Sequence, residues 1–229
     1  MSWMRVPLTT LAKGASMVLA GTLALTLSLG AQANLLERYV EGKDYFLLNK
    51  PVKTEDPNKI EVAELFSYLC PHCYSLEPTI NAWKKNIPED VSFIRKHAQF
   101  NRQYMAYAKL HVAIQLLGIE EKVHEGIFNS VHKSRDMKFE PEDQYDLVKE
   151  AGVKKEDFLK VYDSFAHKSK LKQIEKDMLA YQIQGVPAVI VNGKYRVTVS
   201  SAGTPETMLE VVDFLVDKER SAKKASAKK

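Results

Sequence analysis

Cysteine is scarce in this chain, because Cys70 and Cys73 are the only two among its 229 residues. Small secreted domains that depend on disulfides for stability carry several pairs, so a disulfide-stapled mini-domain is excluded. One bridge between residues three apart closes a very short loop and removes little freedom from the unfolded chain. A purely structural disulfide would therefore contribute little here, and it is kept as the weaker alternative.

The ligands of a typical zinc site are also missing. Structural zinc takes four ligands, and the chain has neither a second cysteine pair nor two histidines at the spacing His-x(3–5)-His. A metal site at the cysteine pair is therefore disfavoured. The remaining interpretation of the segment Phe66–Pro78, FSYLCPHCYSLEP, is a pair of cysteines that reacts.

Long apolar runs are absent after residue 33, so no later segment is expected to span a bilayer. Before that point, Arg5 and Lys13 precede the uncharged run Ala15–Gly30, which is followed by Ala31-Gln32-Ala33. This order predicts a secretory signal peptide, residues 1–33, that is cleaved from the mature chain. The run is 16 residues long. A spanning helix needs about 20 apolar residues, which favours cleavage over a retained anchor.

The chain also lacks a large excess of either charge. Its formal net charge is +4, and without Arg5 and Lys13 of the leader it has 31 basic and 29 acidic residues, a net of +2. Such a balance gives no indication of nucleic-acid binding. The one basic run, SAKKASAKK from residue 221 onward, has no apolar periodicity and is predicted to be a solvated, disordered tail.

Short apolar segments predict strands near both ends of the mature chain. Ile60–Tyr68 is mostly apolar on both parities, as in a central strand that is covered on both faces. Asn192-Gly193 predicts a hairpin with a type I′ turn, because both residues tolerate positive φ. The hairpin would join Val189–Val191 to Tyr195–Val199, and further strands are expected at Tyr45–Leu48 and Val91–His97.

Helical periodicity follows the cysteine pair and fills the middle of the chain. A first helix is predicted at Tyr74–Lys85, with Pro78 as a kink inside it. A last helix is predicted at residues 205–220, with Thr204 as its N-cap. The helices expected between residues 101 and 180 are Tyr104–Leu117, Glu121–Val131, Glu142–Ala151 before Gly152, Glu156–Phe165 and Leu171–Tyr181.

This order of elements predicts an α/β fold with a helical insertion. Strands occur at both ends of the mature chain, and helices alone occupy its middle. We therefore expect one discontinuous α/β domain, residues 34–100 and 181–229, that is interrupted by an all-helical domain, residues 101–180.

The place of the cysteine pair between a strand and a helix indicates its chemistry. The sulfur of Cys70 is expected to be exposed at the helix N-terminus, and that of Cys73 to be sheltered one turn inside. Unpaired N–H groups and the helix dipole stabilise an anion there, so the pKa of Cys70 should fall well below that of a free thiol. His72 adds a hydrogen-bond donor or a positive charge. A stabilised thiolate favours the reduced form, which makes the disulfide an oxidant.

Three sequence features together resemble a DsbA-type thiol:disulfide oxidoreductase. They are the motif CPHCY, Glu77 in the helix after it, and Gly185-Val186-Pro187-Ala188 before the hairpin. With the signal peptide and the helical insertion, the resemblance extends through most of the mature chain. It implies a thioredoxin fold with an inserted all-helical domain, in agreement with the fold predicted from periodicity.

The resemblance implies roles for the residues of the motif. Cys70 would form the mixed disulfide with substrate, and Cys73 would complete or resolve it, so that Cys70–Cys73 is the redox-active disulfide. Pro71 and His72, between the two cysteines, belong to the same catalytic motif.

Four residues outside the motif are further candidates. The resemblance implies a cis Val186–Pro187 bond beside the cysteines, where the Val186 backbone pairs with a substrate strand; an ordinary trans proline is the alternative. Glu64 shares the parity of apolar strand neighbours, so it is expected to be buried, with a raised pKa, and to exchange protons with Cys73. A solvated carboxylate is the alternative. Glu77 is similar to the family's other acidic residue near the site, with a surface position as the alternative.

Several other residues are assigned ordinary places. The family commonly has a lysine near Arg95, and because this chain has Arg95-Lys96, the charge contact at that point is left open. Residues expected on helix surfaces or as caps are His111, His124 and His132. Residues expected in the core, and not as cofactor contacts, are Trp83, Tyr104, Met105 and Tyr107.

The predicted function is that of a monomeric dithiol oxidase, which donates the Cys70–Cys73 disulfide to reduced, newly translocated proteins in a bacterial periplasm. The chemistry requires no bound cofactor. The resemblance implies a quinone-linked membrane protein of the DsbB type as the partner for reoxidation. Two alternatives stay open: a disulfide isomerase or reductase on the same fold, and a non-enzymatic, chaperone-like peptide binder with a structural disulfide.

Overall fold

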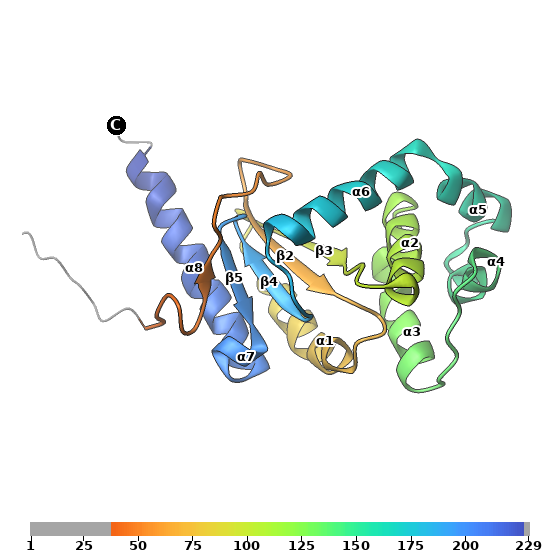
Figure 1. Ribbon diagram of the computed structural model, residues 1–229, viewed down its shortest axis with the longest axis horizontal. Coiled ribbons are helices and arrows are strands. Elements are labelled where there is room, and N and C mark those ends of the chain that lie inside the picture. Colours follow the sequence, from red (N-terminus) through yellow and green to blue (C-terminus); the bar gives the residue numbers. More distant parts are fainter. Residues whose placement is uncertain (1–37, 227–229) are drawn as a thin grey trace, which may run out of the picture. The chain divides into compact units, whose positions relative to one another are not determined.

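The computed structural model describes residues 38–226, and its central element is a five-stranded mixed sheet (Figure 1). The strand order is β1-β5-β4-β2-β3, in which β2 and β3 are parallel and the other neighbours are antiparallel. Every residue of β2 is buried, as its mostly apolar sequence predicts. The strands are β1 Phe46–Leu47, β2 Ile60–Phe66, β3 Val91–His97, β4 Ala188–Val191 and β5 Tyr195–Thr198.

The hairpin of β4 and β5 is confirmed. Asn192 and Gly193 have φ angles of 50° and 62°, the left-handed conformation that the predicted turn requires. A Cβ atom at Gly193 would come within 2.0 Å of the Val52 carbonyl oxygen, so the turn needs glycine there. β5 ends at Thr198, one residue earlier than expected, and the short helix α7 Val199–Ala202 follows it.

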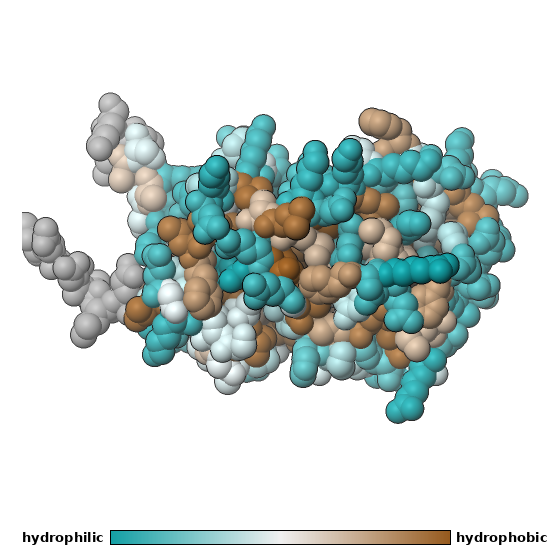
Figure 2. Space-filling model, in the orientation of Figure 1, coloured by the Kyte–Doolittle hydropathy of each residue, from teal (hydrophilic) through white to brown (hydrophobic). Residues whose placement is uncertain are grey.

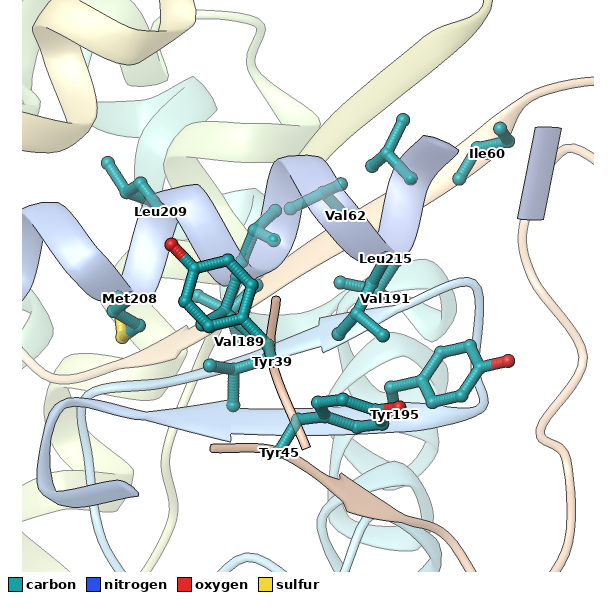
Figure 3. Packing of buried hydrophobic residues seen from close by; sticks show 14 of the residues in the cluster. Tyr39, Tyr45, Ile60, Val62, Val189, Val191, Tyr195, Met208, Leu209 and Leu215 are labelled. Carbon is teal, nitrogen blue, oxygen red and sulfur yellow. The ribbon is translucent and has the colours of Figure 1, made fainter. Parts of the chain in front are cut away.

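Two helices, α1 Pro71–Lys84 and α8 Pro205–Ser226, pack on one face of the sheet. Leu76 of α1, Val62 of β2 and Leu215 of α8 belong to one buried cluster, which Figure 3 shows from close by. The face of the molecule in view in Figure 2 is largely hydrophilic, with hydrophobic residues exposed in small groups. α1 and α8 thus cover the apolar residues on this face of the sheet.

The predicted tail is partly wrong. α8 continues to Ser226, so the chain is helical, and not disordered, over residues 221–226. Lys223 Nζ donates to two backbone carbonyls in the loop before β2, which ties this last part of α8 to the rest of the chain. The predicted signal peptide, residues 1–33, lies outside the described residues. Within residues 38–226, no helix combines the length and the apolar character needed to cross a bilayer.

Only helices and turns occur between β3 and β4 (Figure 1). The expected helix at residues 142–151 is wrong in type, because only its start is α-helical and two 3-10 turns follow before Gly152, whose φ is 86°. Phe165 begins α6 and does not end α5, since the Ser164 hydroxyl caps the N-terminus of α6. The elements are α2 Arg102–Leu116, α3 Glu120–His132, α4 Pro141–Gln144, η1 Tyr145–Leu147, η2 Lys149–Ala151, α5 Lys155–Asp163 and α6 Phe165–Ala180.

A second apolar cluster joins these helices to the end of β2. Phe66 and Tyr68 pack with Phe128 of α3, and both cysteines belong to the same cluster. The described residues form one compact unit, and the division into two domains stays a prediction. The helices between β3 and β4 thus come into direct contact with the segment that carries the sulfurs.

Candidate active site

Cys70 is the N-cap residue of α1, and Pro71 is the first residue of the helix, as the motif predicts. The Cys70 sulfur accepts a hydrogen bond from the backbone N–H of Cys73 at 3.4 Å. The N–H groups of the first helical turn have no partners within the helix, and a thiolate at the N-cap can accept from them. The helix end therefore directs its positive pole at Cys70.

The two thiols have opposite proton affinities. The pKa of Cys70 is lowered to about 6 by the Cys73 thiol, by the backbone N–H groups of Cys73 and His72 and by the charge of His72, all of which outweigh burial. Burial instead raises the pKa of Cys73 far above that of a free thiol. At neutral pH, Cys70 is therefore mostly a thiolate and Cys73 a thiol, as the sequence predicts.

The expected exposure of Cys70 is wrong. Only 6% of the residue is accessible, and Cys73 is fully buried. The Cys70 thiol lies 3.4 Å from the Val186 carbonyl oxygen, and the apolar cluster of the helices packs beside it. Sequence placed the sulfur at a helix end, but tertiary contacts cover that end.

The Val186–Pro187 peptide bond is cis and lies beside the cysteines, as predicted. Next to it is a groove of about 800 Å³. Its lining includes His72 of the motif, Val186 and Pro187 of the cis bond, and residues of β1, β5 and α7.

Glu64 is fully buried on β2, so the prediction is confirmed and the solvated alternative is wrong. Burial raises its pKa to about 8, although the Arg95 charge opposes the shift. Its Oε2 accepts from Arg95 Nε at 3.0 Å, and its Oε1 has no partner among the described residues. The charge of Glu64 acts on the Cys73 thiol and raises the pKa of that thiol further.

Glu77 is also buried, so its surface alternative is wrong. It accepts hydrogen bonds from His124 Nε2 at 3.1 Å, Asn81 Nδ2 at 3.3 Å and Arg95 at 3.4 Å. Burial opposes its ionisation, but the hydrogen bond and charge of His124, with the charge of Arg95, lower its pKa overall. Glu77 is thus held as an anion next to Arg95.

The open question about Arg95-Lys96 has a clear answer in the structure. Arg95 forms ion pairs with Glu64 and Glu77, and its NH1 lies 3.6 and 3.9 Å from carboxylates at the start of α3. Lys96 instead pairs with Asp177 of α6 at 2.5 Å. Both cations are buried. The basic partner of the two candidate acids is therefore Arg95.

Two of the three helix histidines, His111 and His124, do not lie on the surface as expected. His111 and His124 are buried, because α2 and α3 pack against β2 at Phe66, whose ring lies 4.9 Å and 5.3 Å from the two imidazoles. His132 is partly exposed and stacks on Tyr74 at 4.8 Å. Of the expected core residues, Tyr107 is fully buried and Trp83, Tyr104 and Met105 are partly buried.

Sequence reasoning missed two tyrosines near the sulfurs. Burial raises the pKa of Tyr104, and the charges of Cys70 and Cys73 raise it further, which places this α2 residue within electrostatic reach of both. Tyr68, two residues before Cys70, has three polar contacts to histidines. Only the position of Tyr68 beside the motif gave any signal, since the contacts depend on how the helices fold back. Within residues 38–226, no group of three or more candidate ligands is placed to hold a metal ion.

Comparisons with known proteins agree with this geometry. A family model described as DSBA-like thioredoxin domain matches residues 61–213. The chain is 41% identical to the thiol:disulfide interchange protein DsbA of Pseudomonas aeruginosa over 209 residues, which is 91% of this chain and 99% of that protein. It is 42% identical to the protein of the same name from Pseudomonas syringae over 211 residues, 92% of this chain and 99% of that one.

Solved structures give the same result. The crystal structure of Pseudomonas aeruginosa DsbA aligns with a TM-score of 0.78 at 43% identity, covering 81% of this chain and 97% of that one. The oxidoreductase DsbA from Xylella fastidiosa aligns with a TM-score of 0.76 at 26% identity, covering 80% and 98%. The predicted fold class, a thioredoxin fold with a helical insertion, is confirmed.

Proposed function

The chain belongs to the DsbA-like thioredoxin family and is a thiol:disulfide oxidoreductase, and from that premise we propose that Cys70 and Cys73 are its reacting pair and that it works as an oxidase. The observation that carries the proposal is the Cys70 sulfur at the N-terminus of α1, with a pKa lowered to about 6. Stabilising the Cys70 thiolate stabilises the reduced protein relative to the disulfide form. The oxidised protein therefore passes its disulfide on.

The size of the effect supports this direction. One pKa unit favours the thiolate by about 1.4 kcal/mol, and for a two-electron couple about 30 mV corresponds to the same energy. The pKa of Cys70 falls from 9.0 to about 6. With allowance for solvent screening, the thiolate is stabilised by about 2 to 4 kcal/mol, or about 40 to 90 mV of oxidising strength.

The exchange proceeds in two steps that conserve atoms and electrons. A substrate thiolate attacks the Cys70 sulfur, the Cys70–Cys73 bond breaks, and Cys73 leaves as a thiolate that takes up a proton. A second substrate thiolate then attacks the substrate sulfur of the mixed disulfide, and Cys70 leaves as a stable thiolate. The substrate loses two electrons and gains a disulfide, and the protein ends as the dithiol.

Glu64 serves the proton transfer at Cys73. Because its pKa is about 8, Glu64 is mostly protonated at pH 7 and able to donate when Cys73 leaves. During reoxidation the direction reverses, and the Glu64 carboxylate accepts the proton of Cys73. Arg95 contacts both Glu64 and Glu77, and the charges of Arg95 and Glu77 act on Glu64.

The groove beside the cis bond receives the substrate. Pro187 has no N–H, and the Val186 backbone lies at the Cys70 sulfur, so an extended substrate segment would pair with Val186 while its own sulfur reaches Cys70. His72 lies on the groove wall, where it contacts both the Cys70 thiolate and an incoming chain. Pro71 begins α1 and fixes the direction of its first N–H groups.

The proposal extends to the location of the protein, its protein substrates and the partner that reoxidises it. We place the mature protein in a bacterial periplasm, delivered by a cleaved signal peptide at residues 1–33. Its clients are reduced, unfolded proteins that have just crossed the inner membrane. A quinone-linked membrane protein of the DsbB type restores the disulfide.

A glutathione redox titration of the purified protein tests the direction of transfer. We expect the dithiol to predominate at glutathione ratios that keep thioredoxin-like disulfides oxidised. A potential within about 30 mV of the −270 mV that is typical of thioredoxin would instead favour the reductase or isomerase alternative.

The assignment of the two sulfurs is tested with C70S and C73S in the oxidative refolding of a reduced, unfolded client. C70S should be inactive, and C73S, given glutathione disulfide as the oxidant, should trap a mixed disulfide that mass spectrometry identifies at Cys70. Full refolding activity in C70S would contradict catalysis by this pair and would favour the chaperone-like alternative.

A further inference from the structure

Tyr68 is fully buried two residues before Cys70, and each of its polar groups contacts a different histidine. Its backbone N–H donates to His97 Nε2 at 3.0 Å, and its carbonyl oxygen lies 2.8 Å from His132 Nε2. Its hydroxyl lies 2.8 Å from His124 Nδ1. No hydrogen bond of an ordinary strand or helix holds this residue, so side chains from elsewhere in the fold fix its position.

The three histidines come from two elements (Figure 1). His97 is the last residue of β3, and His124 and His132 are eight residues apart on α3, about two turns along one face. α3 belongs to the helices that follow β3, so these helices contact Tyr68 through its carbonyl and its hydroxyl. We call Tyr68 with these three residues the histidine clamp.

The partners define where two of the imidazole protons lie. A carbonyl oxygen only accepts, so His97 donates from Nδ1 to the Ala98 carbonyl at 2.8 Å and leaves Nε2 free to accept from Tyr68. By the same rule, His132 donates from Nε2 to the Tyr68 carbonyl. His97 thus accepts from the backbone N–H of Tyr68, and His132 donates to the backbone carbonyl of the same residue.

The loop that carries Tyr68 contacts the backbone of Cys70 and the sulfur of Cys73. The Cys70 N–H donates to the Ser67 carbonyl at 3.0 Å, and the Leu69 N–H donates to the Ser67 hydroxyl at 3.1 Å. The Ser67 backbone N–H is directed at the Cys73 sulfur. A displacement of Tyr68 would therefore move the residue that contacts Cys73 and the residue that carries the reacting sulfur.

His124 also connects the clamp to the charged cluster. Its Nδ1 faces the Tyr68 hydroxyl, and its Nε2 lies 3.1 Å from Glu77, which in turn contacts Arg95. The clamp thus joins the loop before Cys70 to the carboxylates that surround Cys73. Ordinary core packing would not require a histidine at each polar group of one residue.

We propose that the histidine clamp is a positioning device, which holds residues 67–70 so that the Cys70 sulfur stays at the N-terminus of α1 and which thereby sets the equilibrium between dithiol and disulfide. This inference rests on the proposed function of Cys70. No hydrogen bond given by the described residues joins Tyr68 or these histidines to a sulfur, and they act through the loop. A Cys70 sulfur that moves away from the helix end loses the N–H groups that stabilise its thiolate, so loosening the clamp disfavours the reduced form.

The test compares variants that remove one clamp bond with variants that keep it. Y68F removes only the hydroxyl bond to His124. H132L removes the donor to the Tyr68 carbonyl, whereas H132Q keeps a donor. Both variants lose the stacking of the imidazole on Tyr74. Two matched controls alter buried groups elsewhere: Y107F, whose hydroxyl bonds the Lys138 N–H, and H167Q, whose imidazole bonds the Lys109 carbonyl.

Two readouts distinguish positioning from stability. The first is the equilibrium constant with glutathione, and the second is the pKa of Cys70 from thiolate absorbance. Loss of one buried hydrogen bond changes an equilibrium by about 3- to 10-fold. We expect Y68F and H132L to become weaker oxidants by about that factor, with a raised Cys70 pKa. H132Q, Y107F and H167Q should match the wild type in both readouts.

The proposal fails if Y68F and H132L lose stability while both readouts stay at the wild-type values. If Y68F does not fold, the H132L and H132Q pair decides, because His132 is partly exposed and tolerates substitution better. A wild-type protein that is itself a weak oxidant with an ordinary Cys70 pKa would contradict the proposed function, which is a different result.

Discussion

Arg95 and Lys96 are neighbours on β3, and they place two buried cations on opposite faces of the sheet. Lys96 has one close carboxylate, Asp177, at 2.5 Å. Arg95 lies within 4 Å of four carboxylates, of which Glu64 and Glu77 are buried. Glu64 is the most deeply buried of these acids, and burial raises its pKa although the Arg95 charge opposes the shift, so Glu64 keeps its proton at neutral pH.

The difference shows what separates a structural ion pair from a site. The Lys96–Asp177 pair joins α6 to the sheet. In the Arg95 cluster, His124 and Arg95 keep Glu77 as an anion, and burial together with the charge of Glu77 raises the pKa of Glu64 to about 8. Glu64 also acts on Cys73, whose proton has to be exchanged during the reaction.

Removing each cation in turn should give the largest effect. R95M leaves Glu64 and Glu77 without their partner, and K96M leaves Asp177 without its own. Breaking a buried pair costs about 3 to 5 kcal/mol, so urea unfolding should show a loss of that order in both variants. Only R95M should also shift the glutathione equilibrium. An equal shift in K96M would remove the distinction between the two faces.

The two buried acids of β2 give a sharper test of the proton transfer. Glu64 faces the cysteines, and Glu61 is equally buried on the opposite parity of the same strand. E64Q should slow the step in which Cys73 resolves a mixed disulfide by about 100-fold, the lower range for loss of a general base. E61Q is the matched control and should not slow it.

The measurement follows oxidation of the reduced protein by glutathione disulfide. Acid-quenched samples analysed by mass spectrometry report the glutathione adduct at Cys70. The adduct should accumulate in E64Q and remain transient in the wild type and in E61Q. Accumulation in E61Q, or its absence in E64Q, would show that the proton of Cys73 takes another route.

How stability varies with pH should separate E64Q from the wild type. The folded pKa of Glu64, about 8, lies above its ordinary value of 4.5, so the native state binds more protons than the unfolded state between these values. Stability from this group is complete below about pH 4.5 and is lost as the pH rises toward 8. E64Q should abolish that loss, which urea unfolding at pH 5 and pH 8 would detect. Parallel pH curves for the wild type and E64Q would contradict the raised pKa.

The fold could be predicted well where the signals are local. Asn192-Gly193, the Thr204 cap and the mostly apolar sequence of β2 each depend on a few neighbouring residues, and the structure agrees with them. The same holds for Cys70 at the start of α1, because strand, motif and helix follow one another in sequence.

The site could be predicted only in part, because its remaining contacts join distant segments. Burial of Glu77 and His124 depends on α3 lying against α1, and helical periodicity does not reveal which helix covers which. The exposure of Cys70 was misjudged for the same reason, since Val186 lies 116 residues away. Parity suggested that Glu64 is buried, but nothing local identified Arg95 as its partner.

The smallest effect is expected on the Lys96 face. Y181F removes a hydroxyl that lies 3.4 Å from Lys96 Nζ, a long contact that contributes about 0.5 kcal/mol or less. Thermal unfolding should show a small decrease in stability, and the glutathione equilibrium should not move. A change in that equilibrium would mean that the two faces are coupled.

The account depends most directly on the ionisation of Cys70. Absorbance of the reduced protein near 240 nm, followed as the pH is raised and compared with C70S, reports its thiolate alone. The structure predicts a transition with a pKa of about 6 that is absent in C70S. A single transition near 9, the value of an ordinary thiol, would contradict the proposed direction of disulfide transfer.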